Sequence, residues 1–182
     1  MEQNFHKVKF DGNEYNLPLA RVGKVSIAVF DSYQDIQMCR DAAKDLYEKM
    51  KSKNMTDMDY IIAIEIKGAA LAQRIADFFN KPMVVFRKSK KINFTDVQTA
   101  KVETVTSGHN DLYIDKPSLD LLKGKKVCLV DDVVSSGSSV NAVEKLLNEN
   151  GIELTYKAFV FKEGEAYKKD CVFVDRLQLY GL

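Results

Sequence analysis

Two acidic residues lie side by side directly after an apolar run of the sequence. Asp131 and Asp132 follow residues 127–130, which read Val-Cys-Leu-Val. Adjacent carboxylates at the end of a buried strand can hold a cation or accept hydrogen bonds from the hydroxyls of a sugar. The same pair is also compatible with a surface Asp-Asp ahead of a capped helix, because Asp and Ser are common in both positions.

A segment of serine and glycine follows two residues after the acids. It consists of Ser135, Ser136, Gly137, Ser138 and Ser139, and a helical pattern begins within it. Small residues allow a tight turn, so that backbone N–H groups, hydroxyls and a helix N-terminus can surround one anion. The segment is not a Walker A motif, because the Gly-Lys-Ser/Thr ending is missing. Together with the acids it predicts a site for a phosphate monoester flanked by a diol, as in a ribose 5-phosphate.

Two more polar segments follow apolar runs. Glu-Ile-Lys-Gly comes after Tyr60–Ile64, and Arg-Lys-Ser-Lys-Lys comes after Met83–Phe86. Taken alone, the first is a strand-to-helix turn and the second is a solvated or nucleic-acid-binding face. Their cations are candidates for anion binding, and the glycine of the first segment can adopt a backbone conformation closed to other residues. The candidates are Lys67, Gly68, Arg87, Lys88 and Lys91.

The elements that must position these residues alternate in type along the chain. Apolar residues recur every three or four positions in residues 34–53, which is typical of one face of a helix. Continuous β-branched runs instead predict strands that are buried on both faces. We expect helices at 34–53, 69–80 and 138–150, strands at Tyr60–Ile64, Met83–Phe86, 127–130, 155–161 and 172–175, and short β-like stretches at 7–10 and 25–30.

This order predicts an α/β fold with an open, mainly parallel twisted sheet flanked by helices. Ligands of such sheets gather at the carboxyl ends of the strands, where all the candidate residues fall. Residues 92–111 are polar and have no clear period, so they predict a functional flap or a disordered segment. His109 lies in this segment, and neither it nor His6 is assigned a role.

Composition limits the remaining possibilities. The 27 Lys and Arg nearly balance the 26 Asp and Glu, and a formal charge of +1 gives no overall footprint for nucleic acid or an anionic membrane. No apolar stretch approaches the roughly 20 residues of a membrane span, and the start lacks the apolar core of a signal peptide. Three widely spaced cysteines fit reduced thiols better than disulfides or a zinc site. We expect one domain over residues 1–182, in the cytoplasm.

Residues 127–139 resemble the phosphoribosyl pyrophosphate signature of the type I phosphoribosyltransferases. The resemblance implies that Asp131 and Asp132 contact the ribose hydroxyls, act in catalysis and hold Mg²⁺ through water. It also implies that residues 135–139 cradle the 5-phosphate. The family loop often reads Thr-Gly-Gly-Thr, whereas this chain has Ser-Gly-Ser-Ser at 136–139, which keeps the hydroxyls.

The resemblance covers residues 60–140 and continues weakly over 158–179. Residues 65–68 resemble the pyrophosphate loop of adenine phosphoribosyltransferases, and 87–91 resemble their Arg-Lys-Pro-Gly-Lys segment. This implies that Lys67, Gly68, Arg87, Lys88 and Lys91 bind pyrophosphate. By position, residues 92–111 correspond to the flexible loop that closes over the substrates, and residues 1–33 to a hood over the base.

The implied reaction joins a nitrogenous base to phosphoribosyl pyrophosphate with Mg²⁺, giving a nucleoside monophosphate and pyrophosphate in purine salvage. Hypoxanthine-guanine enzymes carry a third acid where Ser135 stands, so adenine is favoured and xanthine comes next. Ala158 and Gly164-Glu165 depart from the Glu and Gly-Arg of those two groups, which leaves the base open. A homodimer is implied by resemblance. The alternative is a non-catalytic sensor of phosphoribosyl pyrophosphate on the same fold, although no segment remains for a DNA-binding module.

Overall fold

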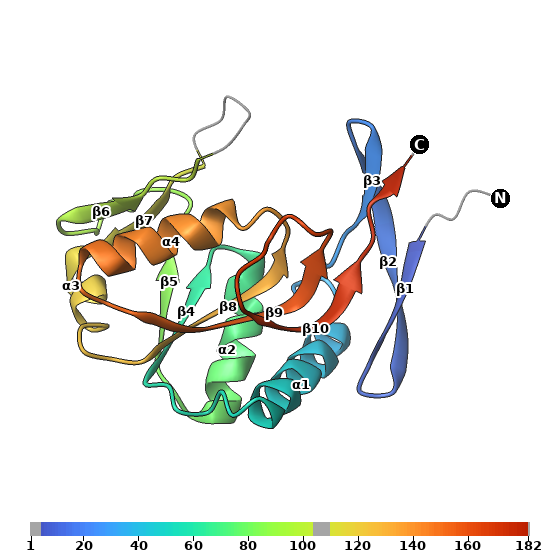
Figure 1. Ribbon diagram of the computed structural model, residues 1–182, viewed down its shortest axis with the longest axis horizontal. Helices are drawn as coiled ribbons and strands as arrows, with labels where there is room; N and C mark the ends of the chain where they lie inside the picture. The colour runs from blue at the N-terminus through green and yellow to red at the C-terminus, as the bar shows by residue number, and fades with distance from the viewer. Residues whose placement is uncertain (1–4, 104–109, 182) are drawn as a thin grey trace.

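The computed structural model describes residues 5–103 and 110–181. Its centre is a five-stranded parallel sheet with the strand order β10-β9-β8-β4-β5 (Figure 1). This confirms the predicted fold class. The strands are β4 (Tyr60–Ile64), β5 (Met83–Phe86), β8 (Val127–Val134), β9 (Leu154–Glu163) and β10 (Val172–Leu177).

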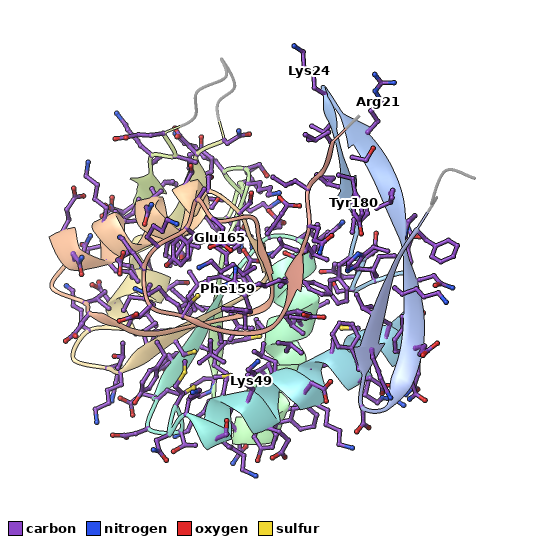
Figure 2. The ribbon with its side chains drawn as sticks, turned by 45° about the vertical axis from the view of Figure 1, so that its right-hand side comes forward. Arg21, Lys24, Lys49, Phe159, Glu165 and Tyr180 are labelled. Atoms are coloured by element: carbon purple, nitrogen blue, oxygen red, sulfur yellow. The ribbon has the colours of Figure 1, made fainter. Side chains whose placement is uncertain are left out.

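Helices cover both faces of this sheet, as the continuous apolar strands require. Ile61 and Ala63 of β4 pack in one cluster with α1 (Ile36–Ser52) and α2 (Lys67–Phe79). Their neighbours Ile62 and Ile64 point to the other face and pack with α4 (Ser138–Glu149). Lys49 of α1, labelled in Figure 2, also donates a hydrogen bond to the Val174 carbonyl of the edge strand β10 at 3.1 Å.

A second sheet, which we call the hood, stands beside the β10 edge of the main sheet (Figure 1). It is antiparallel, with the order β1-β2-β3-β11. Its strands are β1 (Phe5–Phe10), β2 (Asn13–Val22), β3 (Val25–Ala28) and β11 (Tyr180–Gly181). The sequence did not predict β2 or β11, because their hydrogen-bond partners come from other segments. A turn joins β1 to β2, with Asp11 and Gly12 at φ 45° and 85°.

The prediction that residues 92–111 are irregular was wrong in part. Val97–Ala100 forms β6, which pairs antiparallel with β7 (Leu112–Asp115). Ala100 and Leu112 are each 1% exposed and pack in the cluster that contains α4. A short helix, α3 (Lys116–Asp120), follows β7 and was also not predicted. The remainder of the expected flexible loop, residues 104–109 with His109, lies outside the described residues.

The boundaries around the candidate site also differ from the prediction. β8 continues through Asp131 and Asp132 to Val134, so the acids lie within the strand and not after it. α2 begins at Lys67, so Lys67 and Gly68 form its first turn instead of a preceding loop. α4 ends at Glu149, shortly before Gly151, which has a positive φ of 70°.

No helix among the described residues is long and apolar enough to cross a membrane. The three cysteines all fall within the described residues and form no disulfide. Cys39 and Cys128 are buried, and burial raises the pKa of both thiols.

Candidate functional site

The register of the main sheet leaves a notch beside the two acids. β8 pairs with β4 only as far as Val130, which lies opposite Ala63, whereas its pairing with β9 continues to Val134. By this register Asp131 lies beside Ile64, the last residue of β4, and Asp132 lies beyond the end of that strand, where the strand order also changes direction. Such a switch point is where open α/β sheets form their ligand crevices.

Asp131 and Asp132 lie in surroundings that oppose the ionisation of their carboxyl groups. None of the ion pairs formed by the described residues involves either acid. Burial and the adjacent Asp132 raise the pKa of Asp131 well above its usual value, and burial also raises the pKa of Asp132. A cation or a pair of hydroxyl donors would stabilise the charged forms.

Gly68 lies against Asp131 with no room for a side chain. A Cβ built on Gly68 would stand 2.1 Å from Oδ1 of Asp131 and 3.3 Å from its Cα. The expectation that Gly68 needs a special backbone conformation was wrong, because its φ is not positive. Close approach, not backbone freedom, is what requires glycine at this position.

The serine segment forms the wall of a cavity of about 490 Å³ at the N-terminus of α4. All five residues 135–139 line it, together with Asp131 and Lys88. The N-cap residue Gly137 has no side chain to cap α4, and the Ser138 N–H donates to Ser136 Oγ at 3.3 Å, so an anion would meet the helix N-terminus together with these hydroxyls. The hydroxyls of Ser136 and Ser138 lie 2.9 Å apart, which keeps both at the same side of the turn.

Gly137 lies against an aromatic ring from a distant part of the chain. Its φ is +78°, and a Cβ at this position would lie 2.1 Å from Cδ2 of Tyr167. A side chain on Gly137 would therefore collide with the Tyr167 ring. Tyr167 is 2% exposed, and its ring packs edge-on against Phe159.

A second cavity of about 360 Å³ adjoins the first. It is lined by the segment from Ile64 to Gly68 and by Asp132, and it shares Lys88, Asp131 and Ser139 with the first cavity. The structure thus brings Lys67 and Gly68 to one side of the acids and the serine segment to the other. Lys88 lines both cavities.

Arg87 and Lys91 lie close to a carboxylate instead of the cavities. Glu65 accepts a hydrogen bond from the Lys88 N–H at 2.8 Å, and its Oε1 lies 3.5 Å from Nη1 of Arg87 and 3.7 Å from Nζ of Lys91. Burial opposes the charge on Glu65, but these three groups outweigh it and lower its pKa. Neither Arg87 nor Lys91 is among the described residues that line the two cavities.

Two polar residues that line the first cavity were not predicted from the sequence as site residues. Asn110 and Asp111 lie at the edge of the first cavity, and Oδ1 of Asp111 accepts a hydrogen bond from the Val102 N–H at 3.2 Å. No periodicity or motif in residues 92–111 marks them. Their place depends on the pairing of β6 with β7, which is not visible in the local sequence.

The donor set fits a magnesium ion that is held mainly by substrate and water. Among residues 5–103 and 110–181, no three His, Cys, Asp or Glu side chains converge into a metal cage. Mg²⁺ commonly takes only one or two carboxylates and completes its shell with water and phosphate oxygens. The Asp131–Asp132 pair beside two anion-sized cavities meets this requirement.

The comparison with known families decides the family. The model described as "Phosphoribosyl transferase domain" matches residues 29–178, which is most of the chain. The chain belongs to this family. The matched residues include the five strands of the main sheet, Asp131, Asp132 and the serine segment, and the family is the one that the resemblance predicted.

Curated relatives of this phosphoribosyl transferase domain are named as purine enzymes. A hypoxanthine/guanine phosphoribosyltransferase of Methanobacterium lacus is 31% identical over 125 residues, covering 69% of this chain and 63% of the relative. An adenine phosphoribosyltransferase of Prochlorococcus marinus is 31% identical over 113 residues, covering 62% of this chain and 64% of the relative. The matched part thus spans less than two thirds of either relative.

Solved structures share the fold at low sequence identity. Adenine phosphoribosyltransferase from Thermoanaerobacter pseudethanolicus superposes with a TM-score of 0.69 at 17% identity, covering 95% of both chains. The enzyme from Trypanosoma brucei, in complex with AMP, pyrophosphate and ribose-5-phosphate, gives 0.62 at 18% identity, covering 79% of this chain and 66% of that one.

Proposed function

We propose that this protein transfers the phosphoribosyl group of Mg²⁺-phosphoribosyl pyrophosphate to a purine base. The observation that carries the proposal is the pair of acids, Asp131 and Asp132, in a notch between two adjoining cavities. The serine segment on one side suits the 5-phosphate, and the start of α2 on the other suits pyrophosphate. Lys88, Asp131 and Ser139 line both cavities, so one substrate molecule that carries both groups would occupy the two cavities together.

Each group of residues has a distinct task in this proposal. Asp131 and Asp132 accept hydrogen bonds from the ribose hydroxyls and orient C1 toward the base. Residues 135–139 hold the 5-phosphate with N–H groups and hydroxyls at the α4 N-terminus. Lys67, Gly68 and Lys88 bind the departing pyrophosphate, while Arg87 and Lys91 contribute from farther away through Glu65. Bound Mg²⁺, held by Asp131 and Asp132 through water, supplies charge neutralisation for the leaving group.

A purine is the acceptor that the relatives favour, since those reported above are named for adenine and for hypoxanthine or guanine. We propose adenine first and xanthine second, because Ser135 stands where hypoxanthine-guanine enzymes carry an acid. We further propose one functional domain, a homodimer and a cytoplasmic location. Nothing in the comparisons supports the alternative of a non-catalytic sensor.

A pyrophosphate-release assay with Mg²⁺, phosphoribosyl pyrophosphate and a panel of purine and pyrimidine bases tests the proposal. We expect release only when Mg²⁺ and an acceptor base are both present. Asp131→Asn and Asp132→Asn should each lower kcat/KM by at least ~10-fold, because charged hydrogen bonds are worth about 1.5–3 kcal/mol. The proposal would be contradicted if the protein bound substrate but turned over no base. Full activity of both variants would also contradict it.

A further inference from the structure

The connection between the hood and α1 is hydrogen-bonded to the start of α2. Ser32 Oγ donates to the Lys67 carbonyl at 2.9 Å, and the Tyr33 hydroxyl donates to the Ile66 carbonyl at 2.7 Å. In the opposite direction, Lys67 Nζ donates to the Phe30 carbonyl at 3.0 Å. Segments more than 30 residues apart in sequence are thus joined beside the second cavity.

This connection is itself held in a defined turn. Oδ1 of Asp31 accepts from the N–H groups of Tyr33 at 3.0 Å and Gln34 at 3.2 Å. Asp35 then caps α1 by accepting from the Met38 N–H at 2.8 Å. On the other side, the Phe30 ring is 2% exposed and packs edge-on against Phe161, with centroids 5.6 Å apart. The hydroxyls of Ser32 and Tyr33 are therefore presented from a fixed backbone.

The two carbonyls that accept these hydroxyls belong to the peptide units that open α2. In a planar trans peptide unit the C=O and N–H groups point in opposite directions. Fixing the Ile66 carbonyl on Tyr33 thus directs the Lys67 N–H away from the connection, and fixing the Lys67 carbonyl on Ser32 does the same for the Gly68 N–H. Both N–H groups belong to the first turn of a helix, where no side chain caps them.

We propose that Ser32 and Tyr33 are positioning residues that orient the Lys67 and Gly68 N–H groups toward the pyrophosphate half of the substrate. The inference rests on the proposed function and adds a specific task for the hood connection. Neither residue lines the cavities, so each acts through the backbone of residues 66–68. Ser32 is only 4% exposed, so its hydroxyl has little access to water as an alternative partner.

Calorimetric titration of the full chain with Mg²⁺-pyrophosphate and, separately, with ribose 5-phosphate tests this task. We expect Ser32→Ala and Tyr33→Phe each to weaken pyrophosphate binding roughly three- to tenfold, the effect of one lost neutral hydrogen bond. Ribose 5-phosphate affinity should stay within about twofold, because the serine segment at α4 is untouched. Ser32→Thr keeps the hydroxyl and should restore pyrophosphate binding.

Ser52→Ala is the matched control. The Ser52 hydroxyl also donates to a helix carbonyl, that of Lys49, at 2.8 Å. Ser52 is the last residue of α1, at the end of the helix that is farther from Ser32 and Tyr33 in sequence. The Ser52→Ala variant should leave both affinities unchanged. Unaltered pyrophosphate affinity in the Ser32→Ala/Tyr33→Phe double variant would overturn the inference, as would an equal loss of both ligands. A wild-type protein that binds neither ligand would instead overturn the proposed function, and this inference with it.

Discussion

Gly68 and Asp131 illustrate how one contact defines the site at the scale of single residues. Gly68 lies in the first turn of α2 and Asp131 lies within β8, and the Asp131 carboxylate occupies the space that a Gly68 side chain would need. The glycine therefore determines where the carboxylate rests. A charge that must meet a ribose hydroxyl depends on such placement, since displacement by about 1 Å can cost ~100-fold in rate.

Replacing Gly68 with Ala should displace Asp131 and lower kcat/KM by on the order of 10- to 100-fold. Overpacking should also lower the free energy of unfolding by about 1–3 kcal/mol, even though alanine is the better helix former. Steady-state kinetics and urea unfolding measure both effects. Gly181→Ala is the control, because a Cβ there meets nothing within 4 Å and its φ is not positive. Similar behaviour of the two variants would show that the contact with Asp131 is unimportant.

At the scale of elements, the serine segment depends on a second segment that lies beneath it. Tyr167 belongs to the connection between β9 and β10, and its ring meets the position of the Gly137 Cβ. Lys169 of the same connection pairs with Glu144 of α4 at 2.5 Å, and Lys157 of β9 pairs with Glu144 at 2.8 Å. The shape of the loop before α4 is thus fixed partly by this connection.

Gly137→Ala should lower the free energy of unfolding even without ligand. Positive φ alone costs an alanine about 1 kcal/mol, and displacement of the Tyr167 ring should add about 1–3 kcal/mol. Urea unfolding of Gly137→Ala and of Gly124→Ala separates the cost of the positive φ from the cost of displacing the ring. Gly124 has a similar φ of +68°, but nothing lies within 4 Å of its Cβ position. If both variants lose the same amount, Tyr167 exerts no steric restraint on the loop.

Glu144→Gln should remove the attachment of the β9–β10 connection to α4. Burial opposes the charge on Glu144, but hydrogen bonds from Lys157 and Lys169 outweigh it and lower its pKa below its ordinary value of 4.5. Its stabilising contribution is therefore present above pH 4.5 and is lost as the pH falls through the lowered pKa. We expect Glu144→Gln to lower the free energy of unfolding by about 2 kcal/mol relative to the wild type at pH 7, and we expect this deficit to vanish in acid.

Thermal unfolding as a function of pH measures this deficit. Glu48→Gln serves for comparison, since Glu48 pairs with Lys51 at 3.5 Å with both side chains about half exposed. Such a pair contributes little, so this variant should match the wild type at every pH. A pH-independent deficit for Glu144→Gln would indicate lost packing instead of lost charge.

At the scale of the whole molecule, the hood joins the two ends of the chain. β11 pairs with β3, and the Tyr180 hydroxyl lies 2.5 Å from Nδ1 of His6 in β1 (Figure 2). The hood is thus connected to the main sheet both through residues 31–35 and through β10. Residues 31–35 lie next to the second cavity, because Ser32 and Tyr33 donate hydrogen bonds to the carbonyls of Lys67 and Ile66, which line it.

The sequence by itself determined the alternation of buried strands and helices, because that pattern depends on side-chain burial at regular spacing. Tyr60–Ile64 and Met83–Phe86 were predicted with their observed bounds. The acids and the serine segment could also be identified, because residue type and order along the chain suffice for them. The cavities include all the predicted 5-phosphate residues, and of the five predicted pyrophosphate residues they include Lys67, Gly68 and Lys88.

Only the tertiary structure decided which neighbours those residues meet. The pairing of β9 with Asp131 extends β8 through the acids, and the pairing of β6 with β7 orders part of a segment without periodicity. Two further contacts join segments that are distant in sequence. Arg87 pairs with Glu65, and Tyr167 packs against Gly137. Local sequence carries the chemistry of a side chain, but contacts between distant segments depend on the folded chain as a whole.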